Sequence, residues 1–168
     1  METAAPHMGF RARLEAGLTQ GAKVGAVAGF CYWSSSRIGL HEGYWAAISS
    51  IVVMQGDLGS TETASRDRLI GTAIGGVIGW GAGSIWDGHA FVYAVAVAMS
   101  VLLCTALGLG GAGRLTGVTA SIIILVPKSA PLWIVALHRI CEVTYGIVVA
   151  LLFSAVLARL IRPRAPLD

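Results

Sequence analysis

Charged residues are scarce in this sequence. Lys, Arg, Asp and Glu together make up 12% of its 168 residues, well below the roughly 25% typical of a soluble domain. Hydrophobic residues make up 55%, and the mean hydropathy is +0.73. Because a water-soluble domain of this size cannot bury so much apolar surface, we predict a membrane protein whose main partner is the lipid bilayer.

Basic runs and a secretion signal are also missing. The net charge is +3, but no basic stretch carries the interleaved aromatic residues that would follow a phosphate backbone. We therefore expect no nucleic-acid partner. Residues 1–20 contain no continuous apolar core. We expect no cleavable signal peptide, so that the first apolar segment itself directs membrane insertion.

The residue patterns of enzymes and metal sites are absent as well. Cys31, Cys104 and Cys141 each lie in an apolar segment without a Cys-x-x-Cys spacing, where cysteine behaves as a small hydrophobe. The stretch GLGGAG at 108–113 fits a dinucleotide-binding pattern by its letters alone, since no strand–helix–strand unit surrounds it. We interpret it as a flexible connection. The sequence predicts no enzyme, no catalytic residue, no cofactor and no metal site.

What the sequence does contain is a series of six apolar segments. They lie at about residues 18–36, 43–56, 69–86, 89–108, 114–127 and 132–161. The second and fifth are short, because a helix needs ~20 residues to span a bilayer. We predict an all-α, polytopic membrane protein with six transmembrane helices in residues 18–161. A cytoplasmic N-terminal segment at 1–17 and a cytoplasmic C-terminal tail at 162–168 flank this module.

Basic residues predict the orientation of the module. Six spans place both termini and the second and fourth connections on one side of the membrane. That side collects Arg11, Arg13, Arg66, Arg68, Arg114, Arg159, Arg162 and Arg164. Since cytoplasmic loops are enriched in Lys and Arg, both termini are expected in the cytoplasm.

Small residues recur at every fourth position in three of the segments. The stripes are Gly71, Gly75, Gly79 and Gly83; Gly21, Gly25 and Gly29; and, more weakly, Gly146, Ala150, Ser154 and Ala158. Residues four apart share one face of a helix, and helices in lipid associate through close backbone contact at such faces. We interpret the glycines as helix-packing surfaces. A role in lining a transport pathway is the alternative.

The two halves of the sequence align without a gap at a shift of 71 residues. Arg68 then falls on Arg139, Gly75 on Gly146, and Ser50 on Ser121. Three helices per unit would place the second unit upside down in the membrane, which is a 3+3 inverted repeat. In transporters built this way, paired short segments mark the substrate site.

Two arginines and one glutamate are candidates for chemistry. Arg68 and Arg139 each start a glycine-containing helix, on opposite sides of the membrane in the predicted topology, where they would attract a carboxylate. Alternatively they mark interfaces or pair with Asp67 and Glu142. Because ionisable groups at membrane depth are often functional, Glu142 is a candidate proton carrier. Its alternative role is to neutralise Arg139.

Polar side chains of the short segments have two interpretations. Ser49, Ser50 and Gln55 bind either a substrate or a neighbouring helix, and the same holds for Thr116, Thr119 and Ser121. Tyr44 and Trp45 are most simply aromatic residues at the membrane interface.

The stretch YWAAISSIVVMQGDLGSTETASRDRLIGTAIGG at 44–76 resembles the signature of the fusaric-acid-resistance-like superfamily, which includes the aromatic acid exporters. The signature combines a Tyr-Trp pair, an apolar strip ending in Gln, a Gly-containing turn and Arg-x-x-Gly-Thr-x-x-Gly. The matching residues are Tyr44, Trp45, Gln55, Gly59, Arg68, Gly71, Thr72 and Gly75. The later stretch HRICEVTYGIVVALL at 138–152 resembles the sixth span of that family, so the resemblance covers about residues 20–161.

The resemblance implies a six-helix module of the inner (plasma) membrane that exports small organic anions, commonly aromatic carboxylic acids. Two features depart from the family pattern. Gly56 stands where the family often has Pro. Many members also join two six-helix modules with cytosolic domains, whereas this sequence holds one module, so we expect a homo-oligomer.

These observations lead to one functional prediction with two alternatives. Arg68 and Arg139 attract a small organic anion, Thr72, Ser50 and Gln55 orient it, and Glu142 carries a proton. A passive anion channel of the same fold would need no proton carrier. A membrane scaffold subunit would stabilise a partner and transport nothing.

Overall fold

The computed structural model describes residues 9–40, 42–85, 89–126 and 130–161. The described residues form helices and no strand, which confirms the all-α prediction. The helices are α1 (Phe10–Arg37), α2 (Tyr44–Val53), α3 (Leu58–Ile85), α4 (Ala90–Ala106), α5 (Gly110–Leu125) and α6 (Leu132–Ile161). Each predicted apolar segment therefore corresponds to one helix.

Two helices begin well before the predicted segments. α1 begins at Phe10 and α3 at Leu58, whereas the apolar segments begin near residues 18 and 69. The added turns of both helices are rich in polar and charged residues, so hydrophobicity does not detect them. The segment at 1–17, predicted to precede the first helix, therefore contains the first turns of α1.

The early start of α3 is explained by a side-chain cap. The backbone N–H of Ser60 donates to Asp57 Oδ1 at 3.0 Å, and the Ser60 hydroxyl donates to Asp57 Oδ2 at 2.6 Å. An acidic cap satisfies an N–H group that lacks a partner within the helix. These two bonds hold the pKa of the Asp57 carboxyl below its usual range. The ionised cap is therefore present at neutral pH and is lost as pH falls through that lowered pKa.

The glycine-rich stretch at 108–113 differs from its prediction. We expected a flexible connection, but Gly110 to Gly113 form the first turn of α5. Ala112 is fully buried, and a Cβ at Gly113 would lie 3.6 Å from the Cβ of Cys104 in α4. Close packing against neighbouring helices here outweighs the weak helix propensity of glycine.

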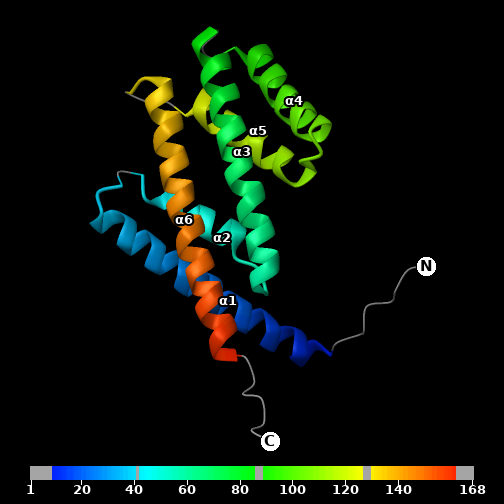
Figure 1. The fold of residues 1–168 in the computed structure, drawn as a ribbon, viewed down its shortest axis with the longest axis vertical. Coiled ribbons are helices and arrows are strands. Elements are labelled where there is room, and N and C mark those ends of the chain that lie inside the picture. The colour runs from blue at the N-terminus through cyan, green and yellow to red at the C-terminus, as the bar shows by residue number, and fades with distance from the viewer. Residues whose placement is uncertain (1–8, 41, 86–88, 127–129, 162–168) are drawn as a thin grey trace, which may run out of the picture.

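α3 and α6 form the centre of the structure. They lie side by side and run in opposite directions (Figure 1). α4 and α5 cover one end of α3, and α1 and α2 cover the other end of the molecule along α6 (Figure 1). α3 makes its most extensive contact with α5. α6 contacts α3 most extensively and α2 next. The third helix of each half of the chain therefore packs on the second helix of the other half.

Three glycines of the α3 stripe, Gly71, Gly75 and Gly79, pack against the backbone of α5, while Gly83 faces the Leu132 side chain of α6. A Cβ at Gly71 would lie 3.0 Å from the carbonyl oxygen of Ala112, and one at Gly79 would lie 3.2 Å from that of Ala120. At Gly75 a Cβ would collide with the carbonyl oxygen of Thr116. Three glycines, four residues apart, thus meet three α5 carbonyls with the same spacing. Glycine is required here because the two backbones approach closely.

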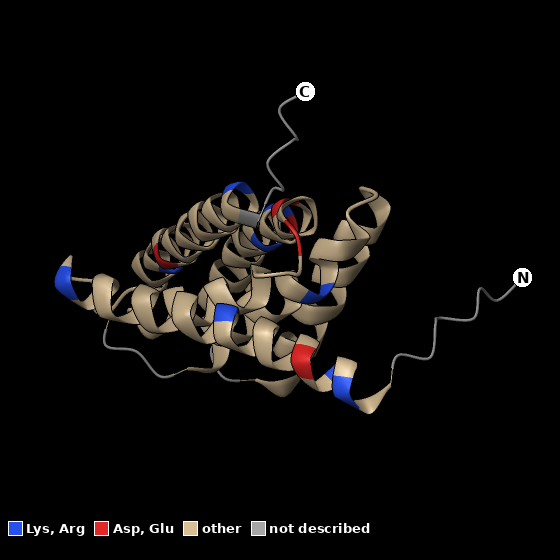
Figure 2. Ribbon diagram, turned by 90° about the horizontal axis from the view of Figure 1, so that it is seen from below, with Lys and Arg blue, Asp and Glu red and all other residues tan. Residues whose placement is uncertain are grey.

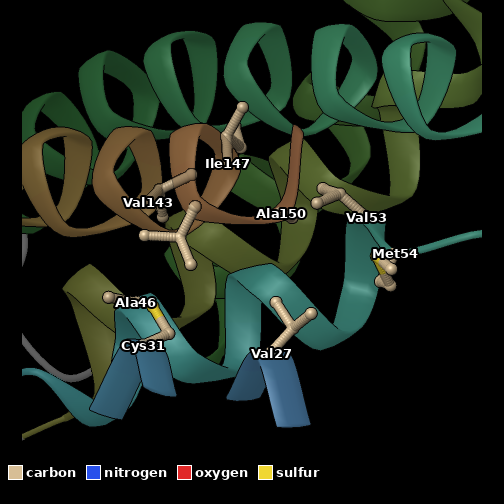
Figure 3. Packing of buried hydrophobic residues seen from close by; sticks show 9 residues of the cluster. Val27, Cys31, Ala46, Val53, Met54, Val143, Ile147 and Ala150 are labelled. Carbon is tan, nitrogen blue, oxygen red and sulfur yellow. The ribbon is translucent and has the colours of Figure 1, made fainter. Parts of the chain in front are cut away.

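The small residues of α6 pack against α2 in the same manner. A Cβ at Gly146 would collide with the carbonyl oxygen of Ala46. Ala150 is fully buried, and the Ser154 hydroxyl lies 3.4 Å from the Met54 sulfur. The surrounding apolar cluster joins three helices (Figure 3): Val27 and Cys31 of α1, Ala46 and Val53 of α2, Met54 at its end, and Val143, Ile147, Val149 and Ala150 of α6.

The glycine stripe of α1 is different. A Cβ added at Gly21, Gly25 or Gly29 would meet no atom within 4 Å. The opposite face of the helix carries the buried residues Val27, Cys31 and Ser35. The predicted packing role of the three glycines is therefore not fulfilled within one chain, and the stripe faces outward.

Helix length and composition single out α6. Of the described helices, Leu132–Leu160 alone is both long and apolar enough to cross a bilayer by these two criteria, with a mean hydropathy of 2.2. α2, α4 and α5 are apolar but have only 10, 17 and 16 residues. The short lengths of α2 and α5 agree with the sequence prediction, while six complete spans stay a prediction.

Candidate functional site

Arg68 and Arg139 lie well inside their helices, in the middle of the structure. Arg68 is 2% exposed and Arg139 is 1% exposed. Charged residues are few along the described helices (Figure 2), and these two are buried. Neither begins a helix, and they do not lie on opposite sides of the molecule as the sequence predicted. Arg68 contacts Ser49 and Arg139 lies over the Trp45 ring, one turn apart on α2, so the two side chains lie close together. The antiparallel contact of α3 and α6 brings the two side chains together, which the linear order of spans does not reveal.

Each terminal nitrogen of Arg139 has a carboxylate partner. Its Nη1 lies 3.2 Å from Glu142 Oε2, one turn along α6, and its Nη2 lies 3.1 Å from Glu42 Oε2. Its guanidinium carbon lies 3.9 Å from the centroid of the Trp45 ring, within the range of a cation–π contact. Two carboxylates and one aromatic face thus compensate for the burial of this cation.

Arg68 has much weaker compensation. Its one hydrogen bond runs from Nη2 to the Ser49 hydroxyl at 3.5 Å, the outer limit of such a contact. Among the described residues, no carboxylate lies within ion-pair distance of it. An unpaired buried charge costs several kcal/mol. Arg68 is therefore a cation placed in an apolar interior beside a second cation, and an anion would stabilise both.

The same region holds a surplus of hydrogen-bond donors. Arg68 Nε, Arg139 Nε and Trp45 Nε1 are buried and have no acceptor among the described residues. Trp45 and Ser49 are one turn apart on α2, so the contacts of the two arginines lie on successive turns of this helix. Buried donors are nearly always paired in folded proteins. Three unpaired N–H donors around two cations are the chemistry of an anion site, because a carboxylate supplies acceptors only.

Glu142 is buried, at 3% exposed, against Arg139. The sequence had offered this pairing as the alternative to proton transfer, and the ion pair is present. A pocket of about 60 Å³, lined by Gly39, Leu40, His138, Cys141 and Glu142, opens beside it. The carboxylate thus lies between a buried cation and a small hollow at the surface, which leaves both interpretations in place.

The other predicted substrate residues are distributed unevenly. Thr72 is fully buried one turn after Arg68, but its hydroxyl donates to the Arg68 carbonyl at 2.8 Å. Ser50 donates to the Ala47 carbonyl at 2.7 Å, so its hydroxyl is not directed at either arginine. Gln55 is exposed past the end of α2. The structure brings Arg68, Arg139 and Glu142 together and leaves Ser50 and Gln55 outside the cluster.

Two members of the cluster were not identified from the sequence. Glu42 was not considered, and Trp45 was assigned to the membrane interface, yet both contact Arg139. A signal did exist for Glu42, because an acidic residue directly before an apolar segment lies on the same side of the predicted topology as Arg139. Ser49 was considered for hydrogen bonding, and the structure assigns it to Arg68.

The chain was also compared with known proteins. The profile of the family described as fusaric acid resistance protein-like matches residues 24–153. This range contains both arginines, the two carboxylates that pair with Arg139, and the close contacts of α3 with α5 and of α6 with α2. Comparisons with curated proteins and with solved structures gave no significant match. The match covers most of the sequence, and the chain belongs to the fusaric acid resistance protein-like family, a family of membrane proteins with a role in transport.

Proposed function

We propose that this protein is a transporter that exports small organic anions, aromatic carboxylic acids in particular, across the inner membrane. The observation that carries the proposal is Arg68, a buried cation without an acidic partner among the described residues, next to Arg139. The unpaired donors Arg68 Nε, Arg139 Nε and Trp45 Nε1 support it further. A carboxylate at this position would accept hydrogen bonds that the fold leaves unmade and would balance the charge of Arg68.

We further propose that the six helices are membrane-spanning or membrane-embedded, with cytoplasmic termini, and that they form a 3+3 inverted repeat. The reciprocal packing of α3 on α5 and α6 on α2 supports the repeat. So do the matching backbone contacts, Gly75 on Thr116 and Gly146 on Ala46. The glycines are 71 residues apart, but their partners are 70 apart. The gapless alignment of the sequence therefore needs a shift of one residue between α2 and α5.

Flux measurements test the proposal. Purified protein in liposomes is expected to move benzoate uphill when a pH gradient is imposed, with Glu142 as the proton carrier beside Arg139. Glu142→Gln is then expected to abolish uphill movement and to retain downhill flux. Equal flux with and without the gradient would favour a passive channel. No flux of benzoate or of related carboxylates would contradict the transport proposal.

We also propose that the protein works as a homo-oligomer that uses the open glycine face of α1. A Cβ at Gly25 meets no atom of the chain within 4 Å, so Gly25→Leu adds bulk to this open face and is expected to reduce the oligomer to the monomer in detergent. Light scattering coupled to gel filtration measures the mass. Ala26→Leu places the same side chain at the next, exposed position of α1 and serves as the control. A monomeric wild type, or an unchanged mass for Gly25→Leu, would argue against this interface.

A further inference from the structure

Resting on the proposed function, we infer that Glu42 is an internal ligand of the anion site, which a substrate carboxylate displaces from Arg139. Glu42 Oε2 accepts a hydrogen bond from Arg139 Nη2 at 3.1 Å across 97 residues of sequence. It is a carboxylate bound to a guanidinium, which is the contact that an organic anion would make.

The two carboxylates on Arg139 differ in their ability to leave. Glu142 is 3% exposed and lies on the same helix as Arg139, so its departure would leave a buried carboxylate without this cation. The Glu42 side chain is 39% exposed and precedes α2. It reaches water by rotation of its own side chain, at little cost in solvation. Glu42 is therefore the exchangeable partner, and Glu142 is the permanent one.

The geometry of Arg139 shows what an incoming carboxylate would gain. Glu142 holds Nη1, Glu42 holds Nη2, and Nε has no acceptor among the described residues. The N–H groups of Nε and Nη2 point in parallel along one edge of a guanidinium. Departure of Glu42 frees this whole edge for a bidentate carboxylate, which makes two parallel bonds where Glu42 makes one. Trp45 lies against the guanidinium carbon and holds its plane in place.

Charge balance indicates the class of ligand. The cluster contains two cations, Arg68 and Arg139, and two carboxylates, Glu42 and Glu142. Both carboxylates pair with Arg139, and the net charge of the cluster is zero. When Glu42 turns into water, one unit of negative charge restores neutrality beside Arg68. A monocarboxylate satisfies this condition, whereas a dicarboxylate would leave an excess negative charge in the interior. Glu42 thus sets both the affinity and the charge of the substrate.

The test is benzoate binding to the full-length protein, measured by calorimetry in detergent. Glu42→Gln removes the competing charge, and we expect benzoate to bind about tenfold tighter than to the wild type. Glu62→Gln, a change of an exposed carboxylate on α3, is the matched control and should leave the affinity unchanged. Benzamide, the neutral analogue of benzoate, should show no gain with any variant.

The outcomes separate this inference from the proposed function. Unchanged or weaker benzoate binding to Glu42→Gln, with measurable binding to the wild type, would overturn the inference and leave the anion site standing. No binding of any small carboxylate to either protein would overturn both. If Glu42→Gln fails to fold, as judged by circular dichroism, Glu42→Asp replaces it. Its shorter side chain weakens the contact with Arg139, so a smaller gain in the same direction is expected, and a loss would overturn the inference.

Discussion

Arg68→Met is expected to weaken benzoate binding about 100-fold or more and to abolish transport, while making the folded protein more stable. Binding falls because the variant removes the buried cation that an anion would pair with, and loss of one partner of a buried charge pair costs roughly 2–5 kcal/mol. Stability rises because Arg68 is buried with one long hydrogen bond and no acidic partner among the described residues. Even a buried ion pair can often be replaced by well-packed apolar residues with no loss, or with a gain of about 1–4 kcal/mol, and an unpaired charge has less attraction to lose.

The control variants make this result specific. Arg66→Met changes an exposed arginine two positions earlier in α3 and should affect neither property. Arg139→Met should also abolish binding but should destabilise the fold by about 3–5 kcal/mol, because it strands the buried Glu142 carboxylate. Two related arginines are thus expected to shift the unfolding temperature in opposite directions. A drop in stability for Arg68→Met would mean that the fold itself, not a ligand, uses this charge.

Gly75→Ala and Gly146→Ala are each expected to destabilise the protein strongly. In an isolated helix, alanine is about 1 kcal/mol more favourable than glycine. Here the added methyl group would collide with a backbone carbonyl, that of Thr116 or that of Ala46. Backbone atoms inside a helix cannot rotate away as a side chain can, so the helices must separate. Overpacking of this kind costs about 1–3 kcal/mol or more.

Gly25→Ala provides the matched control for these two variants. Its methyl group meets no atom of the chain within 4 Å, so monomer stability should be unchanged or slightly raised. Thermal unfolding in detergent, followed by circular dichroism, measures all three. Equal stability of Gly75→Ala and Gly25→Ala would show that α3 and α5 do not touch through their backbones.

Sequence patterns located the helices and the close-packed faces, but not the partner of each face. The four-residue spacing of Gly71, Gly75 and Gly79 shows that another helix approaches α3, and the structure supplies α5 as that helix. Gly21, Gly25 and Gly29 of α1 have the same spacing, but no other helix of the chain packs on them. Periodicity reports that a surface is smooth, and it contains no information about which surface covers it.

The candidate site was predictable in part for the same reason. Arg68, Arg139 and Glu142 were recognised because charges in apolar segments are costly and rare. Their meeting depends on the antiparallel contact of α3 and α6, which a linear arrangement of spans cannot express. Glu42 is separated from Arg139 by 97 residues, and no periodic pattern connects positions so distant. Tertiary geometry alone assigns it to the site.

The exchange of helices between the two halves has a consequence for synthesis of the protein. α3 is complete before α5 has been made, so its glycine face is uncovered when it is first synthesised. The face of α2 that packs on α6 stays uncovered for longer, because α6 is the last helix to be synthesised. α6 also contains Arg139, the ion-pair partner of Glu42. Neither half can complete its helix packing alone during translation. The packing of both halves is completed when the final helix, α6, has been synthesised.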